Sequence, residues 1–260
     1  MTSPIVVAIH RWAVACEISV ELLPSDRYLV DHFGSDDESL RPPQHADRLR
    51  AWEHRHDVHL PPSLRAWLLI SNGFYRSLPL VHPLEAIGPM VLFGELPGIW
   101  VQPESWFELG NPNVETIGVD LAYHWPDRNG DCPIITSGDR ASRTSPKVIA
   151  TGFAAWFLQL LEHGGAEFWL KPGFQPLGDA WLEHRHHAPR PTLPSHLSQA
   201  VLAVERMMIE AADERNIAQS LDLDILDIEQ ILRYLQHRSL SHVATSPGLG
   251  TEVNRTHMTR

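Results

Sequence analysis

The sequence has 260 residues, of which 43% are hydrophobic and 20% are charged, and this balance excludes a chain that is disordered throughout. The formal net charge of -11 opposes binding to nucleic acid or to an anionic membrane, and it favours basic partners. Two cysteines, Cys16 and Cys132, are too few for a disulfide scaffold or a four-thiolate zinc site, so we expect a reducing, cytoplasmic setting.

The first segment, residues 5–30, is rich in β-branched residues and shows no helix cap, so we expect one or two strands there. Its apolar start does not match a secretory signal, because nothing basic precedes it and His10 and Arg11 interrupt it. No other stretch approaches the ~20 apolar residues that a membrane helix requires, so we expect no membrane partner. Residues 34–44 continue as an acidic loop that contains proline.

Two helices are expected next. The first places Leu49, Trp52 and His56 at helical spacing, with Asp47 in the first turn, where a negative charge suits the helix dipole. The second starts at a Pro-Pro-Ser sequence and carries an apolar stripe made of Leu64, Trp67 and Leu68. An Asn-Gly pair then ends this helix, and we expect Gly73 to adopt a positive φ.

The central region, residues 77–149, alternates short apolar runs with Pro and Gly, which is typical of short strands in an antiparallel sheet. Residues 137–147 are expected to form a polar loop. The clearest helix follows at residues 151–163, where large apolar residues recur at helical spacing. Thr151 is expected to cap its start, and a Gly-Gly pair is expected to end it.

The last third of the chain divides into three segments. Residues 171–195 carry five prolines and clustered histidines and are interpreted as a linker or a segment that wraps around the domain. Residues 196–240 have two apolar stripes and are expected to form a helical hairpin or a helix-turn-helix-like segment. The polar tail, 241–260, is expected to be disordered.

Three motifs occur in a familiar order. The first motif has a short helix, then "LP" at the start of a second helix, then "NG": HADRLRAWEHRHDVHLPPSLRAWLLISNGF. The second has strands with an acidic residue and Pro: ETIGVDLAYHWPDRNGDCPIIT. The third is an aromatic helix: KVIATGFAAWFLQLL. Together they resemble the SUKH superfamily over about residues 45–170. This family includes the Smi/Knr cell-wall-synthesis regulator and many bacterial immunity proteins that neutralise toxins.

The resemblance implies a non-catalytic α+β domain that binds another protein. We therefore expect a mostly antiparallel sheet flanked by helices over residues 1–170, with the helical appendage at the C-terminus. The expected partner is a protein, and a basic toxin domain is the more specific possibility. A regulatory adaptor of the Smi/Knr type is the alternative.

Acidic and aromatic residues of the expected loops are the candidate contacts for such a partner. Charge complementarity would speed association and set specificity, and loop aromatics are common binding anchors. Two competing interpretations remain. The tryptophans could pack in the core, and the acidic residues could lie in ordinary solvated loops. The candidate set is Asp36, Asp37, Glu38, Trp100, Trp106, Asp120, Asp127 and Asp131.

Other chemistries lack their sequence patterns. No H-E-x-x-H motif occurs, residues 127–131 lack the spacing of a calcium loop, and no phosphate-binding loop or dinucleotide motif is found. No G-x-S-x-G occurs, and a lone Cys132 with scattered histidines does not establish a nucleophile. We therefore expect no cofactor, no metal and no enzymatic activity.

The C-terminal helices offer one alternative function. ERNIAQSLDLDILDIEQILRYLQHR reads like a helix-turn-helix, which would suit a DNA-binding regulator. However, Asp222, Asp224, Asp227 and Glu229 crowd the turn and the start of the second helix, where phosphates would lie. Nucleic acid is therefore a disfavoured partner.

Overall fold

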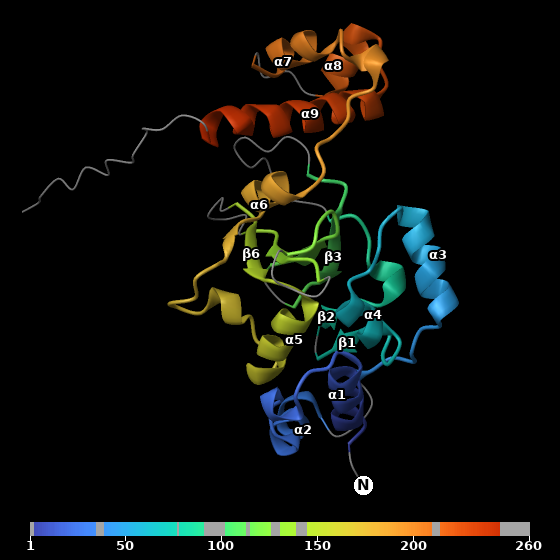
Figure 1. Ribbon diagram of the computed structural model, residues 1–260, viewed down its shortest axis with the longest axis vertical. Coiled ribbons are helices and arrows are strands. Elements are labelled where there is room, and N and C mark those ends of the chain that lie inside the picture. Colours follow the sequence, from blue (N-terminus) through green and yellow to red (C-terminus); the bar gives the residue numbers. More distant parts are fainter. Residues whose placement is uncertain are drawn as a thin grey trace, which may run out of the picture. The chain divides into compact units, whose positions relative to one another are not determined.

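A computed structural model describes most of the chain (Figure 1). The described residues are 3–34, 39–76, 78–90, 102–112, 115–125, 131–138, 145–209 and 214–244. By internal contacts the chain divides into two compact units, and their described parts fall within residues 3–189 and 190–244. The first unit is α+β and the second is helical, as the sequence predicted.

The N-terminal segment is helical, so the prediction of strands over residues 5–30 was wrong. Helix α1 spans Pro4–Ala15, a 3-10 turn η1 spans Val20–Leu22, and helix α2 spans Asp26–Phe33. Proline occupies the first turn of α1, and Ile5, Ile9 and Trp12 repeat at helical spacing on its buried face. This period outweighs the strand preference of the β-branched residues, because burial of a whole helical face contributes more than local propensity.

The next two helices confirm the sequence prediction. Helix α3 spans Ala46–His56 and helix α4 spans Pro62–Leu68. Helix α4 ends a few residues before the Asn-Gly pair, and Gly73 has φ +113°, which is the positive value expected. A two-stranded antiparallel sheet, with β1 at Phe74–Tyr75 and β2 at Pro79–Val81, follows directly.

The main sheet is fully antiparallel and has the strand order β3-β4-β5-β6-β7. Consecutive strands are neighbours, so the sheet needs no crossover connection. In Figure 1, helices α1 and α4 lie on the same side of this sheet as helix α5. The strands span Trp106–Gly110, Ile117–Asp120, Ile134–Thr136, Lys147–Ala150 and Gly178–Asp179.

Helix α5, Phe153–Glu162, is the aromatic helix that the sequence predicted. Its apolar stripe is buried, and Gly164 and Gly165 end it with φ values of +61° and +78°. The expected cap is wrong, since no side chain at the N-cap position hydrogen-bonds into the helix. The carboxylate of Asp131 accepts a hydrogen bond from the backbone N–H of Ala154 at 3.3 Å instead.

The Pro-rich segment is not a linker throughout, which corrects the interpretation of residues 171–195. Strand β7 adds to the sheet beside β6, and helix α6 spans Ala180–His187. Asp179 caps this helix by accepting hydrogen bonds from the backbone N–H groups of Trp181 and Leu182 at 3.1 and 3.2 Å. Helix α6 packs against β6 and β7.

The core of the first unit is centred on Trp12, whose side chain is fully buried. Its ring meets Trp67, Phe153 and Phe157 edge to face, at centroid distances of 6.5, 6.3 and 4.9 Å. Its indole N–H donates to the backbone carbonyl of Ser63 at 3.0 Å. One side chain therefore fixes α1 against both α4 and α5.

The second unit has its own hydrophobic core. After a short 3-10 turn, η5 at Ser195–Leu197, come helices α7 (Val201–Ile209), α8 (Glu214–Leu221) and α9 (Ile225–Ala244). Both predicted apolar stripes contribute to this core. Helix α9 contacts α7 and α8, so the three helices bury a common face. Residues 245–260, most of the predicted tail, lie outside the described residues.

Gly73→Val should lower the free energy of unfolding by about 1 kcal/mol or more, because a β-carbon is strained at this φ. That atom would also lie 3.1 Å from Tyr75 Cε2 and from the carbonyl oxygen of Val81. Chemical denaturation measures the change. Gly88→Val is the control, since a β-carbon there meets nothing within 4 Å and its φ is not positive. Equal stability of the two variants would contradict this account of Gly73.

Candidate functional site

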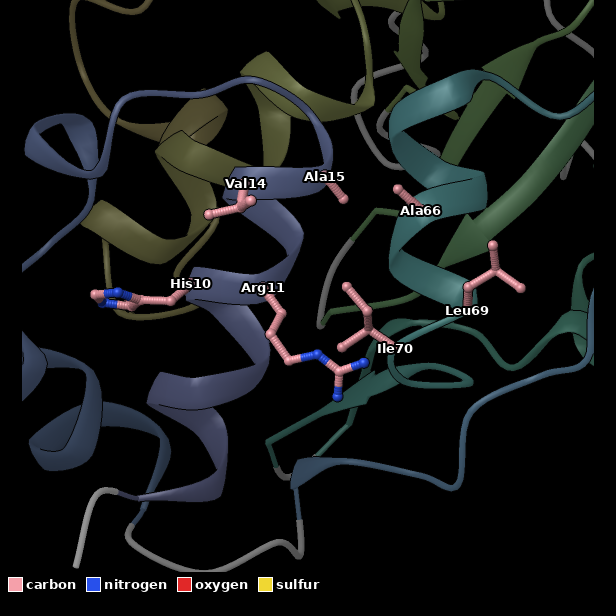
Figure 2. A pocket seen from close by; sticks show the side chains of 7 residues that line it. All are labelled: His10, Arg11, Val14, Ala15, Ala66, Leu69 and Ile70. Atoms are coloured by element: carbon pink, nitrogen blue, oxygen red, sulfur yellow. The ribbon is translucent and has the colours of Figure 1, made fainter.

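A groove between helix α1 and the C-terminal end of helix α4 is the candidate site (Figure 2). Its volume is about 580 Å³. Figure 2 shows side chains from both walls, with Ala15 and Ala66 close to each other and Arg11 extending toward Ile70. The lining consists of His10, Arg11, Val14, Ala15, Ala66, Leu69 and Ile70.

Burial of Trp12 positions the groove walls. Because Trp12 points into the core between α4 and α5, its neighbours Arg11, Val14 and Ala15 lie on the opposite or adjoining faces of α1. On the second wall, Trp67 and Leu68 are buried, whereas Leu69 and Ile70 keep part of their surface at the groove. The same packing that builds the core therefore leaves an apolar groove at the surface.

Among the residues that the structure describes, the groove carries a cationic group without a partner, the Arg11 guanidinium. Among the described residues nothing forms a hydrogen bond or ion pair with the Arg11 guanidinium, whereas His10 Nε2 lies 3.1 Å from Asp26 Oδ1. Val14 is 70% exposed and Leu69 is 38% exposed, so apolar surface flanks this charge. Such a surface can hold apolar side chains and a carboxylate of a partner, and its lining includes no general acid–base pair.

The sequence-predicted contacts lie elsewhere, and five of them fall outside the described residues. These five are Asp36, Asp37, Glu38, Trp100 and Asp127. The other three, Trp106, Asp120 and Asp131, belong to the first unit but take no part in the groove.

Two of these three are interior residues: Trp106 follows the competing interpretation of core packing, and the expected position of Asp120 in a surface loop was wrong. Trp106 is fully buried in strand β3, and Asp120 at the end of β4 is 1% exposed. The Asp120 carboxylate accepts hydrogen bonds from the Trp106 indole N–H at 2.9 Å and from His184 Nδ1–H at 2.6 Å. It also accepts from the Ser105 hydroxyl and the Ala122 backbone N–H, so all its acceptor positions are used.

Asp131 is half-buried and connects three segments of the fold. It accepts a hydrogen bond from the Ser63 hydroxyl, at 2.6 Å and 2.8 Å to its two oxygens, and one from the Ala154 backbone N–H. A β-carbon on Gly152 would lie 2.5 Å from its Oδ2, so only glycine leaves room for this carboxylate. These contacts give Asp131 a structural role at the start of α5.

A second pair of reactive residue types lies near Asp120. Cys132 Sγ is 3.7 Å from His124 Nδ1. Burial, together with the negative charges of Asp120 and Asp131, raises the pKa of the Cys132 thiol to about 12. Burial and the charge of Asp131 raise the pKa of Cys16 to about 11. A nucleophilic cysteine requires the opposite shift, so this environment weighs against catalysis by either thiol.

The described part of the chain has neither a cluster of metal-ligand side chains nor a helix that could span a membrane. Among those residues, no group of three or more His, Cys, Asp or Glu side chains is placed to hold a metal ion. No described helix combines the length and the apolar composition needed to cross a membrane.

In the second unit, α8 and α9 resemble the helix-turn-helix that the sequence suggested. Asp222 occupies the turn with φ +53°, and Asp224 caps α9 by accepting from the Leu226 backbone N–H at 2.9 Å. Both aspartates are exposed. A phosphate approaching the start of α9 would meet these negative charges, which weighs against DNA contact there.

Comparison with models of known protein families gives no match, and comparison with curated protein sequences gives none either.

Sequence reasoning missed the groove and the Asp120–His184 pair for identifiable reasons. Arg11 and Val14 were assigned to strands, although Ile5, Ile9 and Trp12 already showed the helical period. His184 was assigned to a linker, although Asp179 before an apolar pair is a helix-cap signal.

Asp120→Asn should lower the free energy of unfolding by about 2–4 kcal/mol. An amide keeps only one acceptor oxygen, so two of the four donors would face its NH₂ group in either orientation. Urea denaturation tests this. Asp57→Asn is the control, because Asp57 is exposed at φ +51°, a conformation that Asn tolerates. A loss below ~0.5 kcal/mol at position 120 would refute the network.

Cys132 should react slowly with a disulfide reagent in the folded protein. The measurement uses a Cys16→Ala variant, so that Cys132 is the reacting thiol. Folding raises the pKa of Cys132 from 9.0 to about 12, which lowers its thiolate fraction at pH 8 by about 1000-fold. Because the folded-state pKa is the higher one, ionisation of Cys132 should reduce stability as the pH rises from about 9 toward 12. Absorbance kinetics, with urea-unfolded protein as the reference, measure the reaction. Equal rates in folded and unfolded protein would contradict the burial of this thiol.

Proposed function

We propose that the chain binds another protein without catalysing a reaction, and that the partner docks in the groove between α1 and α4. This proposal is carried by the Arg11 guanidinium, which has no partner among the described residues and lies in a mainly apolar groove. The occupant that fits is a protein segment that presents apolar side chains to Val14 and Leu69 and a carboxylate to Arg11.

Hydrophobic burial supports this proposal. Covering apolar surface contributes roughly 25 cal/mol per Å², and Val14 and Leu69 leave such surface in water in the unbound chain. A carboxylate that reaches Arg11 in a partly dehydrated groove forms a charge-assisted hydrogen bond, which adds specificity. The chain's net charge of -11 would attract a partner of positive net charge at longer range.

The protonation of the two cysteines and the burial of the Asp120–His184 pair support a function without catalysis. The raised pKa values keep Cys16 and Cys132 protonated at neutral pH. The Asp120–His184 pair lies in the interior, where Asp120 is 1% exposed and His184 is 8% exposed. These groups therefore serve the fold in our proposal.

The more specific role comes from the SUKH resemblance alone. It favours a cytoplasmic immunity protein that neutralises a cognate bacterial toxin, with a regulatory adaptor of the Smi/Knr type as the alternative. DNA binding through α8 and α9 is less favoured, because acidic side chains crowd the start of α9.

The test captures a partner with the full-length chain from lysate of the source organism and then compares three variants. Val14→Glu places a charge in the groove, and Arg11→Glu reverses its cation; each should weaken binding of the identified partner at least about tenfold. Leu22→Glu is the matched control, because Leu22 is 67% exposed, close to the 70% of Val14, and lies outside the groove. Titration calorimetry with the purified partner measures the affinities.

Each result has a defined meaning. Loss of binding in the two groove variants, with the control retained, supports the proposal. Retention in all three would place the interface elsewhere, and failure to capture any protein would count against a binding function. Circular dichroism verifies that every variant is folded.

A further inference from the structure

Helix α6 contains two buried hydrogen-bond donors that lack an acceptor among the described residues. Trp181 is 5% exposed and Arg185 is 8% exposed. The indole Nε1 of Trp181 and the Nη1 of Arg185 are buried and have no hydrogen-bond partner among the described residues. Both atoms can only donate, so the two positions require an acceptor.

The two side chains share one face of the helix. Residues four apart in an α-helix are neighbours, with β-carbons about 5–6 Å apart. The Trp181 ring is fixed by its surroundings: it stacks on His184 at a centroid distance of 5.6 Å and 15°, and it meets Trp106 edge to face at 6.2 Å. The indole donor is therefore held in position rather than free to rotate.

Three described carboxylates on α6 or at the ends of strands β4 and β7 have other partners. Asp179 pairs with Lys147 Nζ at 3.1 Å and caps α6. Glu183 lies 3.4 Å from His187 Nε2. Asp120 accepts hydrogen bonds from four donors, and one of these donors is His184 of α6. In the part of the chain that the structure describes, no carboxylate forms an ion pair with Arg185.

An arginine without a counterion is costly in such a place. Burial lowers the pKa of the Arg185 guanidinium, but arginine remains charged at neutral pH. A buried charge is stable when it is paired and hydrogen-bonded, and a guanidinium matches the geometry of a carboxylate or a phosphate. This position therefore favours an oxyanion.

We propose that Trp181 and Arg185 form a binding site on α6 for an oxyanion, a carboxylate or a phosphate group. The indole N–H and the guanidinium each donate to oxygens of the anion. The residues are distinct from those of the groove on α1 and α4, so this site stands independently of the proposed function.

The full-length protein, labelled with ¹⁵N, is titrated with inorganic phosphate and separately with acetate, each against sodium chloride of equal ionic strength. The indole N–H resonance of Trp181, assigned by its loss in Trp181→Phe, should shift and saturate. Arg185→Gln should raise the half-saturating concentration about tenfold or more. Arg48→Gln, at an exposed arginine of α3, should leave it unchanged.

Melting temperatures provide the second measurement. Saturating phosphate or acetate should raise the melting temperature by about 2–4 °C in the unmodified protein, and less in Arg185→Gln. Without added anion, Arg185→Gln should melt at or above the unmodified protein, because it removes a buried charge that no described residue compensates. If the site saturates at a lower concentration of phosphate than of acetate, the ligand is a phosphoryl group. If it saturates at a lower concentration of acetate, the ligand is a carboxylate.

Three results would overturn the site. The first is an indole resonance that does not move with either anion relative to chloride. The second is an equal response in Arg185→Gln and the unmodified protein. The third is a marked loss of stability in Arg185→Gln alone, which would mean that the guanidinium already has a stabilising partner within the fold.

Discussion

The first unit depends on the position of one indole ring. Trp12 meets Trp67 of α4 and Phe153 and Phe157 of α5, and its N–H donates to the backbone of Ser63. The hydroxyl of the same Ser63 donates to Asp131, which in turn accepts from the first turn of α5. Apolar packing and a chain of hydrogen bonds thus join the same elements, and neither can shift without the other.

This constraint has a consequence at the surface. With Trp12 fixed, one face of α1 is committed to the core, and the residues that remain must form the outer wall against the end of α4. Arg11 and Val14 are therefore presented at a defined distance from Leu69 and Ile70 by the interior of the domain. The core holds both walls of the groove, so the chain itself would lose little conformational entropy if the proposed partner bound there.

The sequence predicted those elements whose cues are local. The spacing of apolar residues predicted the stripes of α3, α4, α5 and the C-terminal helices. Proline at helix starts and glycine after helix ends predicted further local features, among them the positive φ of Gly73. The rest depends on contacts between distant residues. Asp131, not Thr151, supplies the acceptor at the start of α5, and Asp120 becomes an interior residue only because Trp106 and His184 bring donors to it. Spacing along a chain cannot show such pairings. The groove itself combines residues more than 50 positions apart.

Strand β7 is only two residues long, yet it pairs with β6 at the border of the sheet. A chain that ended at residue 170 would lack this strand and the His184 donor to Asp120, leaving the hydrogen-bonding groups of β6 open to pairing with another molecule. During synthesis, residues 171–179 must therefore leave the ribosome before β6 can pair with β7. Self-association of nascent or truncated chains would begin at β6.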